Sequence, residues 1–184
     1  AFANYLAFTY NTSLVQLTLL MILLALSRRD TTLYRFILTA IMSLIITVSI
    51  WMILPSFGPA ISQTVDPEVE KRINLIVHSE FQAEMKRKIS VGADSIPPTT
   101  TLGLVAFPSF HTIMTLLVVV YAWQTFARWP ALLFNIPMAP AILGQGAHYV
   151  IDVVAGIVVF LIGAWIARKI AQGPEIWPNP SLEN

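Results

Sequence analysis

The chain of 184 residues contains no cysteine. Disulfide bridges, thiolate metal sites and cysteine nucleophiles are therefore excluded. Charged residues are also scarce, at 11% of the chain, whereas a soluble domain has about 25%. The formal net charge is only +1, and so small a positive charge argues against a nucleic-acid partner.

Apolar side chains, in contrast, make up 56% of the chain and give it a mean hydropathy of +0.70. This composition predicts an integral membrane protein, a single all-α domain over 1–184 built as a polytopic helix bundle. Five spans are expected, over 6–26, 33–54, 108–126, 131–143 and 148–167. The fourth is shorter than the about 20 residues that a span needs, and it contains Pro137 and Pro140.

The basic residues that flank the expected spans predict the orientation of the bundle. An alternation of five spans places all of them on one side: Arg28, Arg29, Arg35, Arg128, Arg168 and Lys169. The positive-inside rule makes that side cytoplasmic, in an inner or plasma membrane. The N-terminus and the connection over 60–105 are then extracytoplasmic, and the tail over 172–184 is expected to be a loose cytoplasmic end.

Within that connection, the sequence predicts an amphipathic helix over 67–89. Asp66 before Pro67 is typical of an N-cap followed by proline at the first helical position. Apolar residues then recur at every fourth position from Val69 to Ile89. Such a pattern favours a helix that lies in the outer membrane interface.

Two short polar motifs interrupt the apolar segments, Phe-Pro-Ser-Phe-His at 107–111 and His-Tyr-Val-Ile-Asp at 148–152. Ionisable groups within membrane segments are costly, which makes each motif a functional candidate. His148 and Asp152 are four residues apart, so on a helix they share one face. A carboxylate there can bond the imidazole and prepare a histidine nucleophile or base. The alternative is a structural His–Asp bond between packed helices.

His111 is predicted to lie close to His148, because one intervening span returns the chain to the same face of the membrane. One histidine can then act as the nucleophile and the other as a general acid. Pro108 and Ser109 predict a helix start, whose free N–H groups form a ready anion site together with the serine hydroxyl. The alternative is that Ser109 is only a cap and His111 an interfacial residue.

The two motifs, with Ala155 and Gly156 after the second, resemble the type-2 phosphatidic-acid phosphatase superfamily over about residues 58–163. The closer resemblance is to its divergent subgroup, which contains inositol-phosphorylceramide synthases and bacterial membrane lipid phosphatases. It implies that His148 attacks phosphorus to form a phosphohistidine, which Asp152 orients and stabilises. It also implies that His111 protonates the leaving oxygen, that Ser109 helps to hold the phosphate, and that neither metal nor cofactor is needed. Family members have six spans, so a sixth is expected before residue 1.

One departure from the family concerns the arginine that would clamp the phosphate. In the family, the longer form of the motif with the nucleophilic histidine has Ser-Arg starting seven residues before that histidine. This chain has Ala141 and Ile142 at those two positions. A phosphate transition state still needs positive charge or hydrogen-bond donors. The candidates that remain are Arg87, Lys86, Lys88 and the neutral donor Gln145. For the three basic residues the alternative is a solvated cluster at a helix C-terminus. For Gln145 the alternative is a plain residue of the connection between two helices.

The expected function is that of a lipid phosphate phosphatase whose partner is a membrane lipid. A phospholipid head-group transferase has the same first half-reaction and needs in addition a lipid or polyol alcohol as acceptor. Two further alternatives are a non-catalytic lipid transporter on the same scaffold and an iron or zinc site made from two histidines and one carboxylate. The sequence does not specify an oligomeric state.

Overall fold

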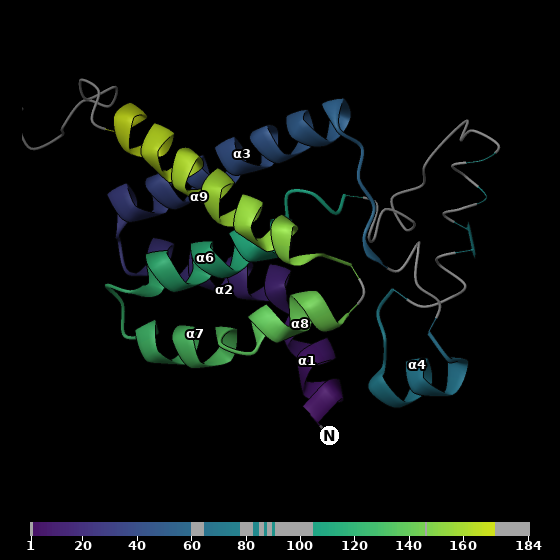
Figure 1. Ribbon diagram of the computed structural model, residues 1–184. Coiled ribbons are helices and arrows are strands. Elements are labelled where there is room, and N and C mark those ends of the chain that lie inside the picture. Colours follow the sequence, from purple (N-terminus) through teal and green to yellow (C-terminus); the bar gives the residue numbers. More distant parts are fainter. Residues whose placement is uncertain are drawn as a thin grey trace, which may run out of the picture.

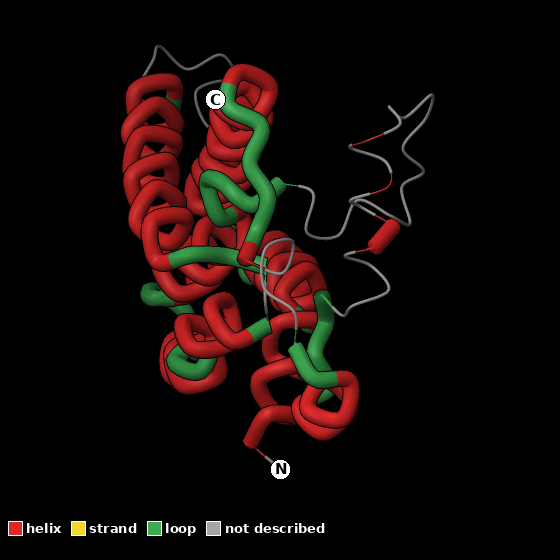
Figure 2. Tube along the Cα trace, turned by 45° about the vertical axis from the view of Figure 1, so that its right-hand side comes forward, coloured by secondary structure: helices red, strands yellow, loops and turns green. Residues whose placement is uncertain are grey.

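The computed structural model describes residues 2–59, 65–77, 83–84, 87, 90, 105–145 and 147–171. The elements within these residues are helices, with no strand among them (Figures 1 and 2). They are α1 (Phe2–Asn11), α2 (Ser13–Leu26), α3 (Asp30–Ile53), α4 (Pro67–Ile73), α6 (Phe110–Ala122), α7 (Arg128–Asn135), α8 (Met138–Gly144) and α9 (Val150–Ile170). The predicted all-α fold is confirmed.

The helix α6 is the centre of the bundle, because α2, α3, α7 and α9 all pack against it. Ile113 and Leu117 of α6 are fully buried in the main apolar core, which also contains residues of α2, α3 and α9. A second, smaller apolar cluster forms where α1 packs on α8. It includes Tyr10, Val77, Met138, Ala141, Ile142 and Ala147.

The prediction of five full spans is corrected by the lengths of the helices. In the described part of the chain, α3 and α9 are long and apolar enough to cross a membrane. The helices α1 and α2 are bent by 53° against each other, and they form a third span if the pair is counted as one helix. The expected third span contains only the 13 residues of α6, about 20 Å of helix against a hydrocarbon core of about 30 Å. The expected fourth span is divided into α7 and α8.

Proline explains why the fourth segment is divided. Pro137 is the N-cap of α8, so it starts a new helix instead of continuing α7. Pro130 and Pro140 each occupy the third position of their own short helix. The N–H groups of a first helical turn have no intrahelical acceptor, and proline is tolerated there.

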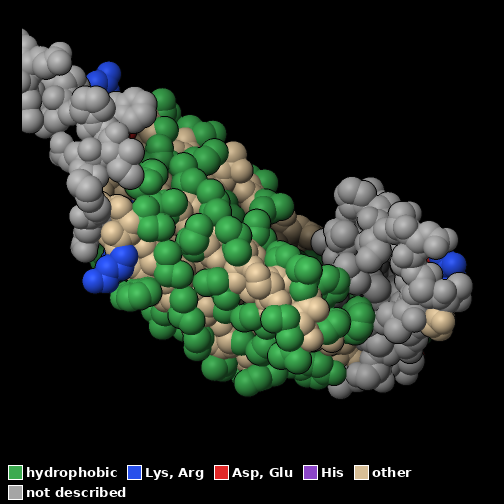
Figure 3. Space-filling model, turned by 90° about the horizontal axis from the view of Figure 1, so that it is seen from above, with side chains coloured by type: hydrophobic (Ala, Val, Ile, Leu, Met, Phe, Trp, Pro, Cys, Tyr) green, Lys and Arg blue, Asp and Glu red, His purple; other side chains and the backbone are tan. Residues whose placement is uncertain are grey.

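The contact between α3 and α9 has the character of a membrane protein interface. The side chains that α3 buries include the small polar residues Thr39, Ser43 and Thr47, while its isoleucines and valines are partly or largely exposed. A Cβ atom on Gly163 of α9 would clash with the Ser43 hydroxyl. Small residues let helices approach closely where lipid covers the apolar outside, and hydrophobic side chains cover most of the face in Figure 3. The chain is therefore a helical membrane protein.

The helix predicted over 67–89 begins as expected but ends early. The Asp66 carboxylate accepts a hydrogen bond from Glu68 N at 2.8 Å, and Pro67 is the first helical residue. Asn74 then adopts the left-handed conformation (φ 52°) and closes α4 at Ile73, a common way for a helix to end. Residues 74–77 are not helical, and in the rest of the predicted range the described positions 83, 84 and 87 are helical. Most of the connection over 60–105 and the tail over 172–184 lie outside the described residues.

Candidate active site

The starts of α6 and α9 lie against each other, and this contact positions both polar motifs. Ser109 N, at the start of α6, donates a hydrogen bond to the main-chain oxygen of Asp152 at 3.0 Å. One turn further along α9, a Cβ atom on Gly156 would lie only 2.6 Å from the Ser109 oxygen. Glycine at position 156 therefore lets the two helix starts meet at backbone distance.

His148 lies just before α9, in the extended segment that ends at the N-cap Tyr149. Its side chain is buried, and its Nδ1 is 2.8 Å from the main-chain oxygen of Ala106. A carbonyl oxygen can only accept, so Nδ1 must carry the proton in this bond. In the neutral ring, Nε2 then has a free lone pair, which is the state that a nucleophile or base requires.

The predicted hydrogen bond between His148 and Asp152 is not formed. The closest approach, from Nδ1 to Oδ2, is 3.7 Å, which is an ion-pair distance but too long for a hydrogen bond. The same Oδ2 atom accepts instead from Tyr149 N at 2.7 Å. The reason is the helix start: His148 precedes α9, so the i, i+4 geometry of a helix does not apply to this pair. Asp152 is nevertheless near enough to stabilise a positive charge on the imidazole.

His111 lies in the first turn of α6, and its ring faces that of His148. The two ring centroids are 5.8 Å apart with an interplanar angle of 63°. The ring of His111 is also stacked on that of Tyr10 of α1, with the centroids 3.7 Å apart and an interplanar angle of 21°. The structure thus brings the two histidines and Asp152 together and adds an aromatic residue that the sequence motifs do not include.

Tyr10 is a member of the site that sequence reasoning missed. It is buried in α1, about a hundred residues from His111 along the chain, and it lies inside an apolar segment with no motif around it. A polar aromatic side chain in a membrane helix is the only signal for it in the sequence. Its stacked ring restricts the orientation of the His111 imidazole beside His148.

Ser109 and Gln145 are both buried and both bonded to the main chain. Ser109 is completely buried, and its hydroxyl accepts from Thr112 N at 3.4 Å as the N-cap of α6. Gln145 follows α8, and its Oε1 accepts from Ile76 N at 2.9 Å. This bond fixes the amide so that its NH₂ group is the end left to donate. Their contacts with phosphate remain predictions.

The proposed basic clamp has only one member within the described residues. Arg87 forms a bidentate pair with Glu84, with both N–O distances at 2.8 Å. This hydrogen bond and the charge of Glu84 raise the pKa of the exposed guanidinium. Lys86 and Lys88 lie outside the described residues. In the part of the chain that is described, no group of three His, Cys, Asp or Glu side chains is arranged to hold a metal ion.

The comparison with known families gives one match. The model of the PAP2 superfamily matches residues 1–166, and the chain belongs to that family. Its members are generally phosphatases or phosphotransferases. No curated protein and no solved structure matches the chain.

Proposed function

We propose that this member of the PAP2 superfamily is a lipid phosphate phosphatase that acts through a phosphohistidine on His148. The observation that carries the proposal is the bond from His148 Nδ1 to the Ala106 oxygen, beside the facing ring of His111. It leaves one imidazole nitrogen free to attack and a second imidazole close enough to act on the same phosphoryl group.

In the first step, His148 Nε2 forms a bond to phosphorus while the bond from phosphorus to the lipid oxygen breaks. Protonated His111 gives its proton to that oxygen, which leaves as the lipid alcohol. The imidazole of His148 becomes positively charged, and this charge is stabilised by the Ala106 carbonyl and by the Asp152 carboxylate 3.7 Å away. In the second step, His111 takes a proton from water, whose oxygen attacks phosphorus and releases inorganic phosphate and free His148.

The negative charge of the phosphoryl oxygens needs donors, and the start of α6 supplies some of them. The first N–H groups of a helix have no intrahelical acceptor and favour an anion. Phe110 and His111 are the first two residues of α6. The NH₂ group of Gln145 is a further candidate, since its oxygen is already held by Ile76.

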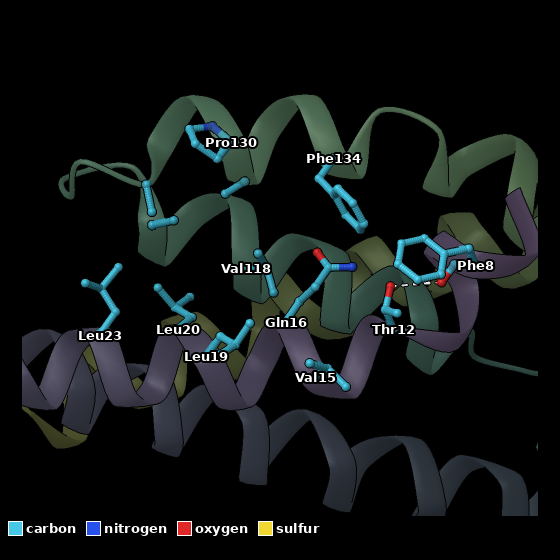
Figure 4. A pocket seen from close by; sticks show the side chains of 13 residues that line it. Phe8, Thr12, Val15, Gln16, Leu19, Leu20, Leu23, Val118, Pro130 and Phe134 are labelled. Atoms are coloured by element: carbon cyan, nitrogen blue, oxygen red, sulfur yellow. Dashed lines mark hydrogen bonds between the residues drawn. The ribbon is translucent and has the colours of Figure 1, made fainter. Parts of the chain in front are cut away.

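A long apolar pocket between the helices of the bundle supports a lipid as the substrate. It has a volume of about 390 Å³ and lies between α1 and α2 on one side and α6 and α7 on the other. Figure 4 shows Phe8, Thr12 and Phe134 at one end and Leu23 and Pro130 at the other. The pocket and the candidate site share two helices, because Phe8 and Val118 line the pocket while Tyr10 and His111 lie elsewhere on the same α1 and α6. The eleven residue steps of helix from Thr12 to Leu23 give it a length of about 16 Å, which suits an alkyl chain.

The proposal can be tested with purified protein in lipid nanodiscs without added metal. Lipids with labelled phosphate are presented to the native protein, to His148→Ala and His111→Ala, and to the matched control His78→Ala, which replaces the chain's third histidine. We expect free phosphate from the native protein and from the control, and none from the two site variants. Acid-labile label should be trapped on the native protein during turnover, and it should be absent from His148→Ala.

The same experiment separates the head-group transferase. A lipid alcohol is added in a parallel sample, and label that appears only in a new lipid would show transfer in place of hydrolysis. Equal turnover by His148→Ala and the native protein would disprove the phosphohistidine mechanism for both activities. Turnover that is absent from every sample, with no label on the native protein, would favour a non-catalytic scaffold.

A further inference from the structure

A second cleft lies at the end of the bundle opposite to the histidines. It has a volume of about 550 Å³ and forms because α6 ends at Ala122, whereas α9 continues to Ile170 alongside the start of α3 (Figure 1). Tyr121 lines it and follows His111 by ten residues on the same helix, which separates the two places by about 15 Å. The cleft is therefore distinct from the candidate active site.

Two arginines from different helices line this cleft, Arg35 of α3 and Arg168 of α9. No acidic side chain is among the described residues that line it, and within the described chain neither guanidinium has an ion pair. Arg35 Nε is buried without a hydrogen-bond partner. The nearby Tyr121 hydroxyl bonds Thr39 Oγ1 and the main-chain oxygen of Arg35. A buried cationic donor without a partner is costly, and an anion in the cleft would provide one.

The surroundings of the two arginines indicate what kind of anion fits. The guanidinium fork matches phosphate oxygens in a bidentate manner. The rim of the cleft is apolar and open, with Val120, Leu161 and Trp165 exposed by 45%, 58% and 61%. Trp123 also lines it, and indole rings favour the head-group level of a membrane. A free phosphate needs no such apolar rim, whereas a lipid phosphate with attached chains does.

We propose that this cleft binds the phosphate group of an anionic membrane phospholipid, with Arg35 and Arg168 as the phosphate ligands and the exposed faces of α6 and α9 against its chains. The site is separate from the phosphatase chemistry and does not depend on it. Its lipid comes from the leaflet opposite to the histidines.

The experiment uses the tryptophans of the cleft as probes. The three tryptophans outside it are replaced by phenylalanine, which leaves Trp123 and Trp165, and the protein is placed in phosphatidylcholine nanodiscs. Small fractions of brominated phosphatidylglycerol or brominated phosphatidylcholine are then added and fluorescence quenching is measured. We expect the anionic lipid to quench well above its mole fraction and the zwitterionic lipid to quench only in proportion to it.

Matched variants separate a built site from general surface charge. Arg35→Gln with Arg168→Gln is expected to weaken the apparent affinity for the anionic lipid by about fivefold for each arginine removed. Arg28→Gln with Lys169→Gln removes the same charge at residues that do not line the cleft, and it is expected to change the affinity by less than about twofold. Arg168→Gln alone serves if the double variant does not fold, because Arg168 is exposed.

Three outcomes would overturn the proposal. The first is an equal loss of affinity in both double variants, which would show surface potential only. The second is no loss in any arginine variant. The third is displacement of the brominated lipid by inorganic phosphate, which would assign the cleft to a soluble phosphate instead of a lipid.

Discussion

Gly156 is a point of close approach between α9 and the start of α6, and its replacement by alanine tests the geometry on which the site depends. The new Cβ atom would lie 2.6 Å from the Ser109 oxygen and 2.9 Å from Thr112 Cβ, whereas ordinary contact begins at 3.4 Å. The helices must therefore separate by about 0.8 Å at this point. Such overpacking typically costs about 1–3 kcal/mol of folding free energy.

The expected effect on activity is larger than the effect on stability. The displacement acts on Ser109, whose N–H bonds the Asp152 oxygen, and on the turn that presents His111. A misplacement of about 1 Å can lower a catalytic rate about 100-fold. We therefore expect Gly156→Ala to release phosphate from a lipid phosphate about 100 times more slowly than the native protein in nanodiscs, and to unfold at a lower temperature.

The matched control is Gly144→Ala in α8. A Cβ atom there meets no other atom within 4 Å, and alanine is a better helix former than glycine by about 1 kcal/mol. This variant should keep its activity and be as stable as the native protein or slightly more so. If Gly156→Ala releases phosphate as fast as Gly144→Ala and unfolds at the same temperature, the close approach of α6 and α9 is wrong. The thermal measurement decides this even if the substrate is not the proposed one.

Three other predictions follow from individual contacts. Tyr10→Leu removes the ring stacked on His111 and should lower kcat about tenfold with little change in KM. Tyr10→Phe keeps the stacked ring and should keep most of the activity. Equal kcat values for the two variants would refute this positioning role of Tyr10. Asp152→Asn removes the negative charge 3.7 Å from His148 and weakens the hydrogen bond from Tyr149 N. The kcat for phosphate release should therefore fall at least tenfold. The free energy of unfolding should fall by about 1 kcal/mol, as measured by thermal unfolding. Because the chain has no cysteine, a single cysteine introduced at exposed Glu68 or exposed Ser27 reports the membrane topology directly. A membrane-impermeant maleimide added to intact cells should label the cysteine at position 68 and not the one at position 27. The reverse labelling pattern would invert the proposed orientation.

The proximity of His111 and His148 was predictable because helix starts are visible in sequence. Pro108 and Ser109 mark the beginning of α6, and an apolar segment follows His148. The chain must return to the same face of the membrane between them, so two motifs at helix starts meet regardless of how the intervening segment folds. That segment consists of α7 and α8 and not of one full helix, and the meeting of the motifs is unaffected.

The hydrogen bonds of the site were not predictable in the same way. The expectation for His148 and Asp152 assumed that both lie on one helix, and a shift of the helix start by two residues changes the partner of each. His148 bonds a main-chain oxygen of Ala106, which any residue at that position would provide. Tyr10 reaches the site from α1, and no local pattern indicates such a distant contact. Backbone acceptors and long-range stacking have no sequence motif.

The missing phosphate clamp shows how packing and chemistry are linked at this site. Ala141 and Ile142 stand where the family resemblance expects serine and arginine, and both are buried in the apolar cluster that includes Tyr10. An arginine at position 142 would put an unpaired cation into that cluster, at high cost. The two positions instead belong to the same apolar cluster as the Tyr10 ring that is stacked on His111. The proposed mechanism therefore predicts that the charge on the phosphate is met from the N-terminus of α6, from Gln145 or from the segment over 60–105.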